Sequence, residues 1–337
     1  MLDIMVHLAT FFDIRYLSRG LALYESLLAK KTPFFLWILC MDTESLEAIK
    51  KRELKNAGIV SVQDLERFDN RVSIAKNNRS TVEFYFTIKS FLCKYILEMN
   101  KNINLLTYID ADTYFFGNPE VIIDTMNGYS IALSPHRFST PNKFLECYGK
   151  FNAGFISFRN DAFGLSCLNW WTDQCFSWCH DYLENNRYAD QLYLDQIPEK
   201  FSNVLIADSK GINLAPWNIN DNNITADKNG ISVNGSSLVF FHFHGLKKIN
   251  DQCYDTGISG YKTRLNSNIK EIIYLPYLSR LRDIDEKLNL QQNQTSIRYE
   301  KINMQKLTLT GRIKSILSKV KLKLNRWYYN SYIFQKS

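Results

Sequence analysis

Two aspartates one residue apart follow an apolar run of the sequence. Residues 105–109 read LLTYI, and Asp110 and Asp112 come directly after them. Carboxylates at this spacing can converge on one cation, and hard oxygen ligands suit Mg²⁺ or Mn²⁺ shared with substrate phosphates. Two like charges beside a buried strand also need a counter-charge. The pair therefore predicts a divalent metal site, and an ordinary surface turn is the alternative.

The stretch VFFHFHGLKK supplies further candidate ligands. In an alternating strand, His242 and His244 would lie on the same side, and Gly245 would end the strand before Lys247 and Lys248. Histidine binds divalent ions, and lysine can neutralise a phosphate group. The alternative interpretation is a pair of hydrogen-bonded histidines at the edge of a sheet.

The first half of the chain predicts alternating strands and helices. Strands are expected over 2–10, 33–42, 59–68 and 102–110, and helices over 16–31, 43–58 and 80–100. This order favours a doubly wound α/β fold with a mainly parallel sheet flanked by helices. Ligands of such sheets bind beyond the carboxyl ends of the strands, where Thr10 and Asp42 would lie beside the two aspartates.

After residue 150 the pattern becomes mixed. We expect a strand over 151–158, helices over 167–183 and 188–201, a hairpin at Asn229–Gly230 and a strand over 237–245. From about residue 262 the chain is expected to be helical and polar. The predicted parts are a main domain (1–260), a helical and linker segment (261–297) and a basic tail (298–337).

The composition is that of a folded protein. Apolar residues make up 45% of the 337 residues and charged residues 22%, which argues against a disordered chain. No apolar run approaches the length of a membrane span, and the N-terminus lacks the features of a signal peptide. The seven cysteines include a CxxxC pair at Cys175 and Cys179 without a second pair nearby, so we expect reduced thiols in a cytoplasmic protein.

The positive charge lies in the tail. Residues 298–337 hold ten Lys and Arg and one acidic residue, Glu300, so the net charge of this segment is +9. Because the net charge of the whole chain is +7, the remaining residues carry a net charge of −2. Residues 306–328 are expected to form a basic amphipathic helix that binds an anionic membrane surface, which would place the protein on the inner face of the cytoplasmic membrane. A helix packed on the domain and a nucleic-acid contact are the alternatives. Deletion of 298–337 is expected to spare activity.

Four motifs occur in a recognisable order: YIDADTYFF, FNAGFISF, DQLYLDQ and the spacing H-x-x-G-x-x-K. Together they resemble the nucleotide-sugar glycosyltransferases of the GT-A fold, and most closely glycosyltransferase family 8, the glycogenin and galactosyltransferase-like group. They are also similar to bacterial sugar transferases of polysaccharide assembly. The resemblance covers about residues 1–250.

The resemblance implies a role for each matching residue. Asp110, Asp112 and a histidine would bind Mn²⁺ or Mg²⁺, and Asp190 and Gln191 would lie beside the reacting sugar carbon. The implied nucleotide-sugar contacts are Ala9, Thr10, Tyr16, Lys89, Asp110, Ala111, Asp112, Asn152, Ala153, Gly154, Lys247 and Lys248, and the implied acceptor side is Trp217 and Asn218. A helix cap or an ion pair is the alternative role for Asp190.

The sequence also departs from the family pattern. Ile249 and Asn250 stand where the family has Pro-Trp, which leaves either Lys247 or Lys248 as the phosphate lysine. Lys89 stands where the family commonly has an arginine. His244 competes with His242 as the metal ligand.

The resemblance implies a metal-dependent hexosyltransferase. Its donor would be a nucleotide diphosphate sugar, most simply a UDP-sugar, and its acceptor a lipid-linked glycan of a bacterial surface polysaccharide, with retention at the sugar carbon. Two alternatives are a non-catalytic, membrane-attached binding subunit and a sugar-phosphate nucleotidyltransferase. The second usually has a glycine-rich phosphate loop after its first strand, and HLATFFDIRYL contains no glycine.

Overall fold

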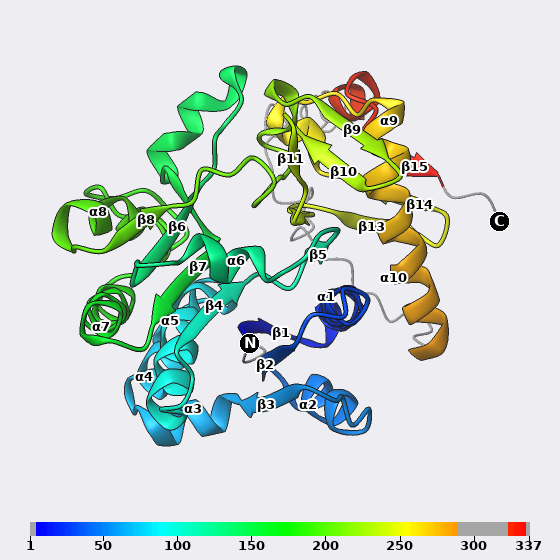
Figure 1. Cartoon of the computed structure of the whole chain (residues 1–337). Helices are drawn as coiled ribbons and strands as arrows, with labels where there is room; N and C mark the ends of the chain where they lie inside the picture. The colour runs from blue at the N-terminus through cyan, green and yellow to red at the C-terminus, as the bar shows by residue number, and fades with distance from the viewer. Residues whose placement is uncertain (1–4, 289–322, 335–337) are drawn as a thin grey trace, which may run out of the picture.

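A seven-stranded sheet forms the centre of the protein in the computed structural model, which describes residues 5–288 and 323–334 (Figure 1). The strand order is β3-β2-β1-β4-β7-β6-β8. In this sheet β7 runs antiparallel to both of its neighbours, and the other pairs are parallel. The predicted α/β class with a mainly parallel sheet is therefore confirmed.

The strands of this sheet are β1 (Val6–Phe12), β2 (Phe34–Cys40), β3 (Ala57–Ser61), β4 (Leu105–Ile109), β6 (Ile131–Pro135), β7 (Phe151–Arg159) and β8 (Val204–Ile206). The smaller sheets contain β5 (Thr113–Phe115), β9 (Ile224–Asp227), β10 (Gly230–Val233), β11 (Ser236–Ser237), β12 (Phe240–His242), β13 (Lys247–Asn250), β14 (Cys253–Asp255) and β15 (Tyr332–Phe334). The helices are α1 (Leu17–Leu28), α2 (Thr43–Lys50), α3 (Val62–Phe68), α4 (Arg71–Asn78), α5 (Thr81–Met99), α6 (Val121–Thr125), α7 (Ala162–Ser177), α8 (Ile197–Lys200), α9 (Ser267–Ile269) and α10 (Leu275–Leu288).

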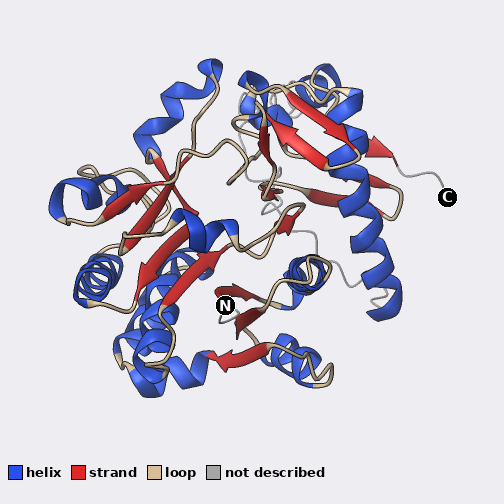
Figure 2. Ribbon diagram, viewed as in Figure 1, coloured by secondary structure: helices blue, strands red, loops and turns tan. Residues whose placement is uncertain are grey.

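Helices cover both faces of the central sheet (Figure 2). Leu8 and Ile109 belong to a core shared with α1 and α10, whereas Ala9 and Tyr108 belong to a core shared with α5 and α7. Successive residues of a strand point to opposite faces, so each strand contributes to both cores. Because the parallel strands are buried on both sides, their sequences are almost continuously apolar.

The prediction for residues 43–68 was partly wrong. The helix α2 ends at Lys50, and Glu53 and Asn56 adopt positive φ values in the turn that follows. The predicted strand over 59–68 is β3 followed at once by α3. Ser61 accepts a hydrogen bond from the main-chain N–H of Asp64, whose carboxylate accepts one from the N–H of Ser61. This reciprocal cap begins a helix inside what the apolar pattern predicted as strand.

Two later elements also differ from the prediction. A 3-10 helix at Leu192–Gln196 and the short helix α8 replace a single helix over 188–201, and Pro198 lies near the start of α8 instead of closing it. The strand predicted over 237–245 is limited to β12. Gly245, with φ of 79°, belongs to the turn that follows. The hairpin predicted at Asn229–Gly230 is confirmed by the pairing of β9 with β10.

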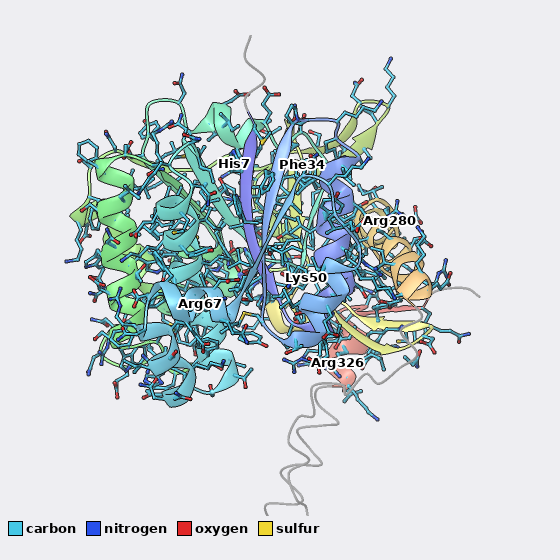
Figure 3. The ribbon with its side chains drawn as sticks, turned by 90° about the horizontal axis from the view of Figure 1, so that it is seen from below. His7, Phe34, Lys50, Arg67, Arg280 and Arg326 are labelled. Atoms are coloured by element: carbon cyan, nitrogen blue, oxygen red, sulfur yellow. The ribbon has the colours of Figure 1, made fainter. Side chains whose placement is uncertain are left out.

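The end of the chain joins the fold. Strand β15 pairs with β14, which pairs with β13, so residues 332–334 complete a three-stranded sheet. Figure 3 shows Arg326 beside these strands, on the side of the molecule that carries α10 and Arg280. Most of the predicted basic helix, residues 306–322, lies outside the described residues. No helix within residues 5–288 or 323–334 has the length and hydrophobicity that a membrane crossing requires.

Helix α5, which carries Lys89, begins at a well-bonded cap. The Glu83 carboxylate accepts hydrogen bonds from the N–H of Ser80 at 2.9 Å and of Asp181 at 3.3 Å, and it contacts Nδ1 of His180 at 2.8 Å. Burial alone would raise the pKa of Glu83, but these bonds outweigh it and lower the pKa to about 2. The charged carboxylate therefore links the start of α5 to the chain that follows α7.

This cap predicts a pH-dependent stability. Because the folded-state pKa of Glu83 lies below its ordinary value, its contribution is present above about pH 4.5 and is lost as the pH falls towards 2, and it amounts to at most about 3 kcal/mol. Glu83→Gln should lower the free energy of unfolding at pH 7 and have a much smaller effect near pH 3, measured by urea unfolding. An equal loss at both pH values would contradict the assignment.

Candidate functional site

The two aspartates lie where β4 turns into β5. All five residues of β4 are buried. The N–H of Asp110 donates to the carbonyl of Gly154 on β7 at 3.1 Å, and the carbonyl of Asp110 accepts from the N–H of Thr113 at the same distance. The turn is therefore closed on both sides, and it holds Asp110 and Asp112 at the carboxyl end of a strand of the main sheet.

Strand β12 brings His242 to the same place. His242 pairs with Thr113 in the antiparallel β5–β12 ladder, and the N–H of Phe243 donates to the carbonyl of Asp112 at 2.8 Å. A second main-chain bond, from His242 N–H to the carbonyl of Leu214, is also 2.8 Å long. Residues about 130 positions apart in the sequence thus become neighbours through main-chain bonds alone.

The side chains of Asp110, Asp112, His242 and His244 form a compact cluster. Nε2 of His242 lies 3.1 Å from Oδ1 of Asp112 and 3.7 Å from Oδ2 of Asp110. One ligand atom each of Asp112, His242 and His244 lie within 4.8 Å of one another. His242 is 1% exposed and Asp112 is 8% exposed, whereas His244 lies at the open side of the cluster. The cluster can therefore be reached from solvent on one side.

The chemistry of this cluster fits a divalent cation. Neither ring nitrogen of buried His242 has a hydrogen-bond partner among the described residues. Burial alone would raise the pKa of Asp112 and lower that of His242, but their mutual attraction reverses both shifts. The ionised carboxylate of Asp112 and the imidazole of His242, which would release its proton on binding a cation, are a suitable donor set for Mn²⁺ or Mg²⁺. Asp110, Asp112 and His242, with His244 at the rim, would hold such an ion.

Lys89 connects the aspartates to Asp190. Its Nζ lies 2.9 Å from Oδ2 of Asp190 and 3.6 Å from Oδ1 of Asp110, and it donates to the carbonyl of Ala153 at 3.0 Å. Burial opposes a charged lysine, but the two carboxylates outweigh it and raise the pKa of Lys89. Asp190 is 2% exposed, and burial raises its pKa against the opposing effect of Lys89. The ammonium group is thus shared by two carboxylates at the base of the site.

Gly154 allows the site to close tightly. A Cβ atom at this position would lie 2.6 Å from Oδ2 of Asp110, 2.7 Å from Oδ1 of Asn152 and 2.7 Å from Cε1 of His242. The absence of a side chain therefore lets a strand of the main sheet approach the cluster. Asn152 accepts a hydrogen bond from the amide of Asn213 at 3.2 Å, which fixes its side chain at the edge of the cluster.

The residues predicted to contact the nucleotide lie on β1 and in the turn after it. Ala9 and Thr10 are buried in β1, and the hydroxyl of Thr10 has no hydrogen-bond partner among the described residues. Tyr16 is half-buried, and the guanidinium of Arg19 lies 4.3 Å from the centre of its ring. Ala111, between the two aspartates, is 5% exposed. Direct contact of these residues with a nucleotide stays a prediction.

The remaining predicted site residues, Gln191, Trp217, Asn218 and Lys248, differ in the contacts that they make. The Gln191 amide donates to the carbonyl of Tyr148 at 2.9 Å, and Trp217 packs edge-on against His242. Asn218 is fully buried, and its amide bonds only to main-chain groups, so it supports the loop that it belongs to. Lys248 lies in β13, where its ammonium group is held by carboxylates.

Comparison with known proteins places the chain among curated relatives. No protein-family model matches the sequence. YfnF of Bacillus subtilis is 31% identical over 241 residues, which are 68% of this chain and 78% of YfnF. The chain belongs to the same family as YfnF. YfnD of the same organism is 26% identical over 286 residues, which are 83% of this chain and 90% of YfnD. Both relatives carry the description of uncharacterised proteins.

Solved structures also resemble the chain. The galactosyltransferase LgtC in complex with donor and acceptor sugar analogues aligns with a TM-score of 0.48 at 14% identity, over 72% of this chain and 87% of LgtC. Mouse xyloside xylosyltransferase 1 aligns with a TM-score of 0.45 at 13% identity, over 72% and 98% of the two chains. The glycosyltransferase GlyE of Streptococcus pneumoniae gives 0.46 at 13% identity, over 85% and 64%. All three are glycosyltransferases by name.

Sequence reasoning missed several residues of the site in this member of the YfnF family. The hydroxyl of Tyr108 donates to Oδ1 of Asp110 at 2.7 Å, and Nη2 of Arg19 donates to the carbonyl of Leu246 in the loop after His244. Tyr108 could have been found, because it lies two residues before Asp110 on an alternating strand. Nothing in the sequence near Arg19 points to a loop more than 200 residues away.

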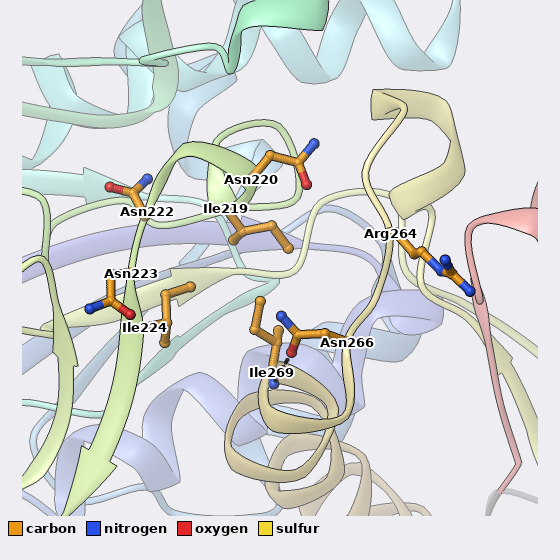
Figure 4. Close-up of a pocket in the computed structure, with 8 residues that line it drawn as sticks. All are labelled: Ile219, Asn220, Asn222, Asn223, Ile224, Arg264, Asn266 and Ile269. Carbon is orange, nitrogen blue, oxygen red and sulfur yellow. Dashed lines mark hydrogen bonds between the residues drawn. The ribbon is translucent and has the colours of Figure 1, made fainter.

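A polar recess lies in the chain segments that follow Trp217 and Thr263 (Figure 4). Its volume is about 180 Å³, and it is lined by Ile219, Asn220, Asn222, Asn223, Ile224, Arg264, Asn266 and Ile269. Several of its amides are used within the protein. The amide of Asn220 donates to the hydroxyl of Thr263 at 3.0 Å, and Oδ1 of Asn266 caps the helix that begins at Ser267. These bonds hold two of the amides that line the recess in place.

The close approach at Gly154 generates a prediction. Gly154→Ala should displace Asp110 and His242, and we expect binding of Mn²⁺ to weaken by about tenfold or more, since residues behind metal ligands typically contribute about 10–100-fold. Electron paramagnetic resonance of free Mn²⁺ would measure the affinity. The matched control is Gly260→Ala, because a Cβ atom there would have no neighbour within 4 Å. Equal Mn²⁺ affinities in the two variants would contradict the assignment.

Proposed function

We propose that this protein is a metal-dependent glycosyltransferase. It would move a hexose from a nucleotide diphosphate sugar, most simply a UDP-sugar, to a glycan acceptor, with retention at the sugar carbon. The acceptor class would be a lipid-linked glycan of a bacterial surface polysaccharide. The observation that carries the proposal is the cluster of Asp112, His242 and His244, with Asp110 3.7 Å from His242, at the carboxyl edge of the sheet, where ligands of such folds bind.

Charge explains how this cluster would serve glycosyl transfer. A departing diphosphate gains negative charge as the bond from the sugar to oxygen breaks, and groups that stabilise this charge accelerate the reaction. A divalent cation held by Asp110, Asp112 and His242 would supply positive charge there. Lys247 and Lys248 follow in β13, and the Arg19 guanidinium lies beside the same loop. The residues of the chain would thus hold the phosphates and the cation in one place.

Asp190 would act through its negative charge. The sugar carbon becomes positively charged as the leaving group departs, so a fixed carboxylate nearby lowers the energy of that state. Because Asp190 is buried and ion-paired with Lys89, we expect electrostatic stabilisation from it and no covalent intermediate. Retention would then follow if an oxygen of the departing phosphate takes the proton of the acceptor hydroxyl on the same face.

Two other functions are less well supported. A binding subunit without turnover would not need Lys89 and Asp190. Burial of this ion pair has a desolvation cost, and ligand binding by other residues does not require the pair. A nucleotidyltransferase would be expected to carry a glycine-rich loop after β1, and residues 11–19 contain no glycine. Release of free sugar from a nucleotide sugar by the pure protein would separate the glycosyltransferase from both.

Calorimetry would test the proposal. UDP, GDP, CMP and dTDP would each be titrated with Mn²⁺ and with EDTA, and we expect binding of one nucleotide, UDP, that EDTA abolishes. Asp112→Asn should weaken this binding at least about a hundredfold, because it removes a ligand and not only its support. Asp227→Asn, at the exposed end of β9, is the control. Absence of binding for all four nucleotides by the folded protein would refute the proposal.

The membrane contact that the sequence predicts stays part of the proposal. In the described part of the tail, Leu324 is 60% exposed, Trp327 is 77% exposed and Tyr328 is 62% exposed. Lys323 is exposed beside them, whereas Arg326 of the predicted basic face turns towards the protein and pairs with Asp255. Exposed aromatic residues next to basic ones suit the interface of an anionic bilayer.

Vesicle binding would test this contact without deleting the tail. Replacing Leu324 and Trp327 with serine should weaken binding to vesicles that contain anionic lipid by about tenfold or more, because apolar burial contributes about 25 cal/mol per Å². Ile74→Ser is the control, since Ile74 is 47% exposed on α4. Sedimentation with vesicles would measure the difference. Unchanged binding of the double variant would remove the tail from the membrane contact.

A further inference from the structure

The last described residues of the chain support the loop that carries the candidate phosphate lysines. In β15, Tyr332 pairs with Asp255 and Ile333 pairs with Tyr254 of β14. On the other side of β14, Asp255 pairs with Lys247 and Tyr254 pairs with Lys248. A segment that the sequence predicts to be a detachable tail is therefore the third strand of the sheet that contains both lysines.

Asp255 is the centre of this support. It is 2% exposed, and its Oδ2 lies 2.8 Å from Nε of Arg326, which forms an ion pair with it. Its Oδ1 accepts hydrogen bonds from the hydroxyl of Ser331 at 2.6 Å and from the N–H of Gly257 at 3.1 Å. One buried carboxylate thus joins the end of the chain to the turn after β14.

Main-chain bonds reinforce this contact. The N–H and the hydroxyl of Thr256 both donate to the carbonyl of Ser331, at 2.8 Å and 2.9 Å. The N–H of Leu265 donates to the carbonyl of Tyr329 at 3.0 Å. Ser331 and Ile333 are fully buried. The segment 323–334 is therefore packed into the protein, although its helix exposes apolar side chains on the other side.

A glycine contact continues the connection to the site. A Cβ atom on Gly257 would lie 2.7 Å from the carbonyl oxygen of Gly245, so the turn after β14 touches the turn after His244. Gly245 and Gly257 both have positive φ values, of 79° and 72°, which favour glycine. Gly245 lies between His244 and Lys247 in the sequence. Movement of the Asp255 turn would therefore reach the candidate metal and phosphate ligands.

We infer that residues 323–334 position the loop of residues 244–248 for the phosphates of the donor, and that Asp255 and Arg326 are the positioning residues. The inference rests on the proposed function for the identity of the ligand, a nucleoside diphosphate. It replaces the expectation that deletion of 298–337 spares activity, because the deletion removes β15 together with both partners of Asp255 in this segment, Arg326 and Ser331.

The variant Arg326→Met in the full-length chain tests the inference, since it leaves the Asp255 carboxylate buried without its cation. We expect affinity for UDP with Mn²⁺ to fall between about 10- and 100-fold, because small displacements of positioning groups have effects of this size. Affinity for uridine, which lacks phosphate, should change less than about twofold, because contacts to the nucleoside and contacts to the phosphates contribute independently. Arg326→Lys, which keeps the charge, should restore most of the UDP affinity.

Two further measurements keep the test decisive. Ser331→Ala is the milder variant for the case in which Arg326→Met does not fold, and Arg282→Met is the control, because the Arg282 side chain is 42% exposed and its ion pair is 3.9 Å long. Hydrogen exchange of residues 244–250 in the free protein should become faster in the Arg326→Met and Ser331→Ala variants and stay unchanged in the control.

The outcomes separate the inference from the proposed function. If the unmodified protein binds no nucleotide, the proposed function fails, and the exchange rates of residues 244–250 still decide whether the C-terminal segment holds the loop. Unchanged exchange in both test variants would overturn the inference. An equal loss of UDP and uridine affinity would overturn it as well, because it would show a general loss of structure instead of a displaced phosphate loop.

Discussion

Burial of negative charge at one edge of the sheet is the constraint that shapes this structure. Asp110, Asp112 and Asp190 lie at the carboxyl end of the strands, and two of them are almost completely shielded from solvent. Carboxylates in such surroundings are costly unless cations or donors lie beside them. Lys89 from α5 supplies a positive partner for Asp190, and His242 from β12 lies 3.1 Å from Asp112. The positions of α5, β4 and β12 therefore follow from one electrostatic requirement.

The same requirement divides the site into two halves with different chemistry. Lys89 lies 2.9 Å from Asp190, so the charge of this carboxylate is balanced within the chain. In the other half, Asp112 lies beside His242 and His244, and the ring nitrogens of His242 lack hydrogen bonds among the described residues. A cation from solution would complete this second half, while the first half keeps its own. Under the proposed function, the half around Asp112 would bind the metal and Asp190 would stabilise the positive charge that develops on the sugar carbon.

Local sequence patterns predicted the strands and helices that place these residues. The contacts between residues far apart in the sequence could not be predicted in this way. The apolar run before Asp110 and the helix over 80–100 could be predicted because their periodicity is local. The helix α3 was missed because its start depends on the reciprocal bonds of Ser61 and Asp64, which an apolar pattern does not reveal. The contact of Lys89 with Asp190 joins residues 101 positions apart, and only the resemblance placed Lys89 near the donor phosphate and Asp190 beside the reacting sugar carbon. None of these signals predicts the hydrogen-bond partner of the Gln191 amide.

The C-terminal segment shows which contacts the charge pattern of the sequence does not reveal. A run of basic residues with an apolar stripe is typical of an interfacial helix, but it does not reveal that one arginine is the partner of a buried aspartate 71 residues earlier. Strand pairing over such separations depends on side chains at both ends, so neither β14 nor β15 is recognisable alone. Since β14 also pairs with the strand of Lys247 and Lys248, residues 332–334 and the two candidate phosphate lysines belong to one sheet. A membrane contact through the exposed face of this segment would therefore act on the protein within two strands of the candidate donor site.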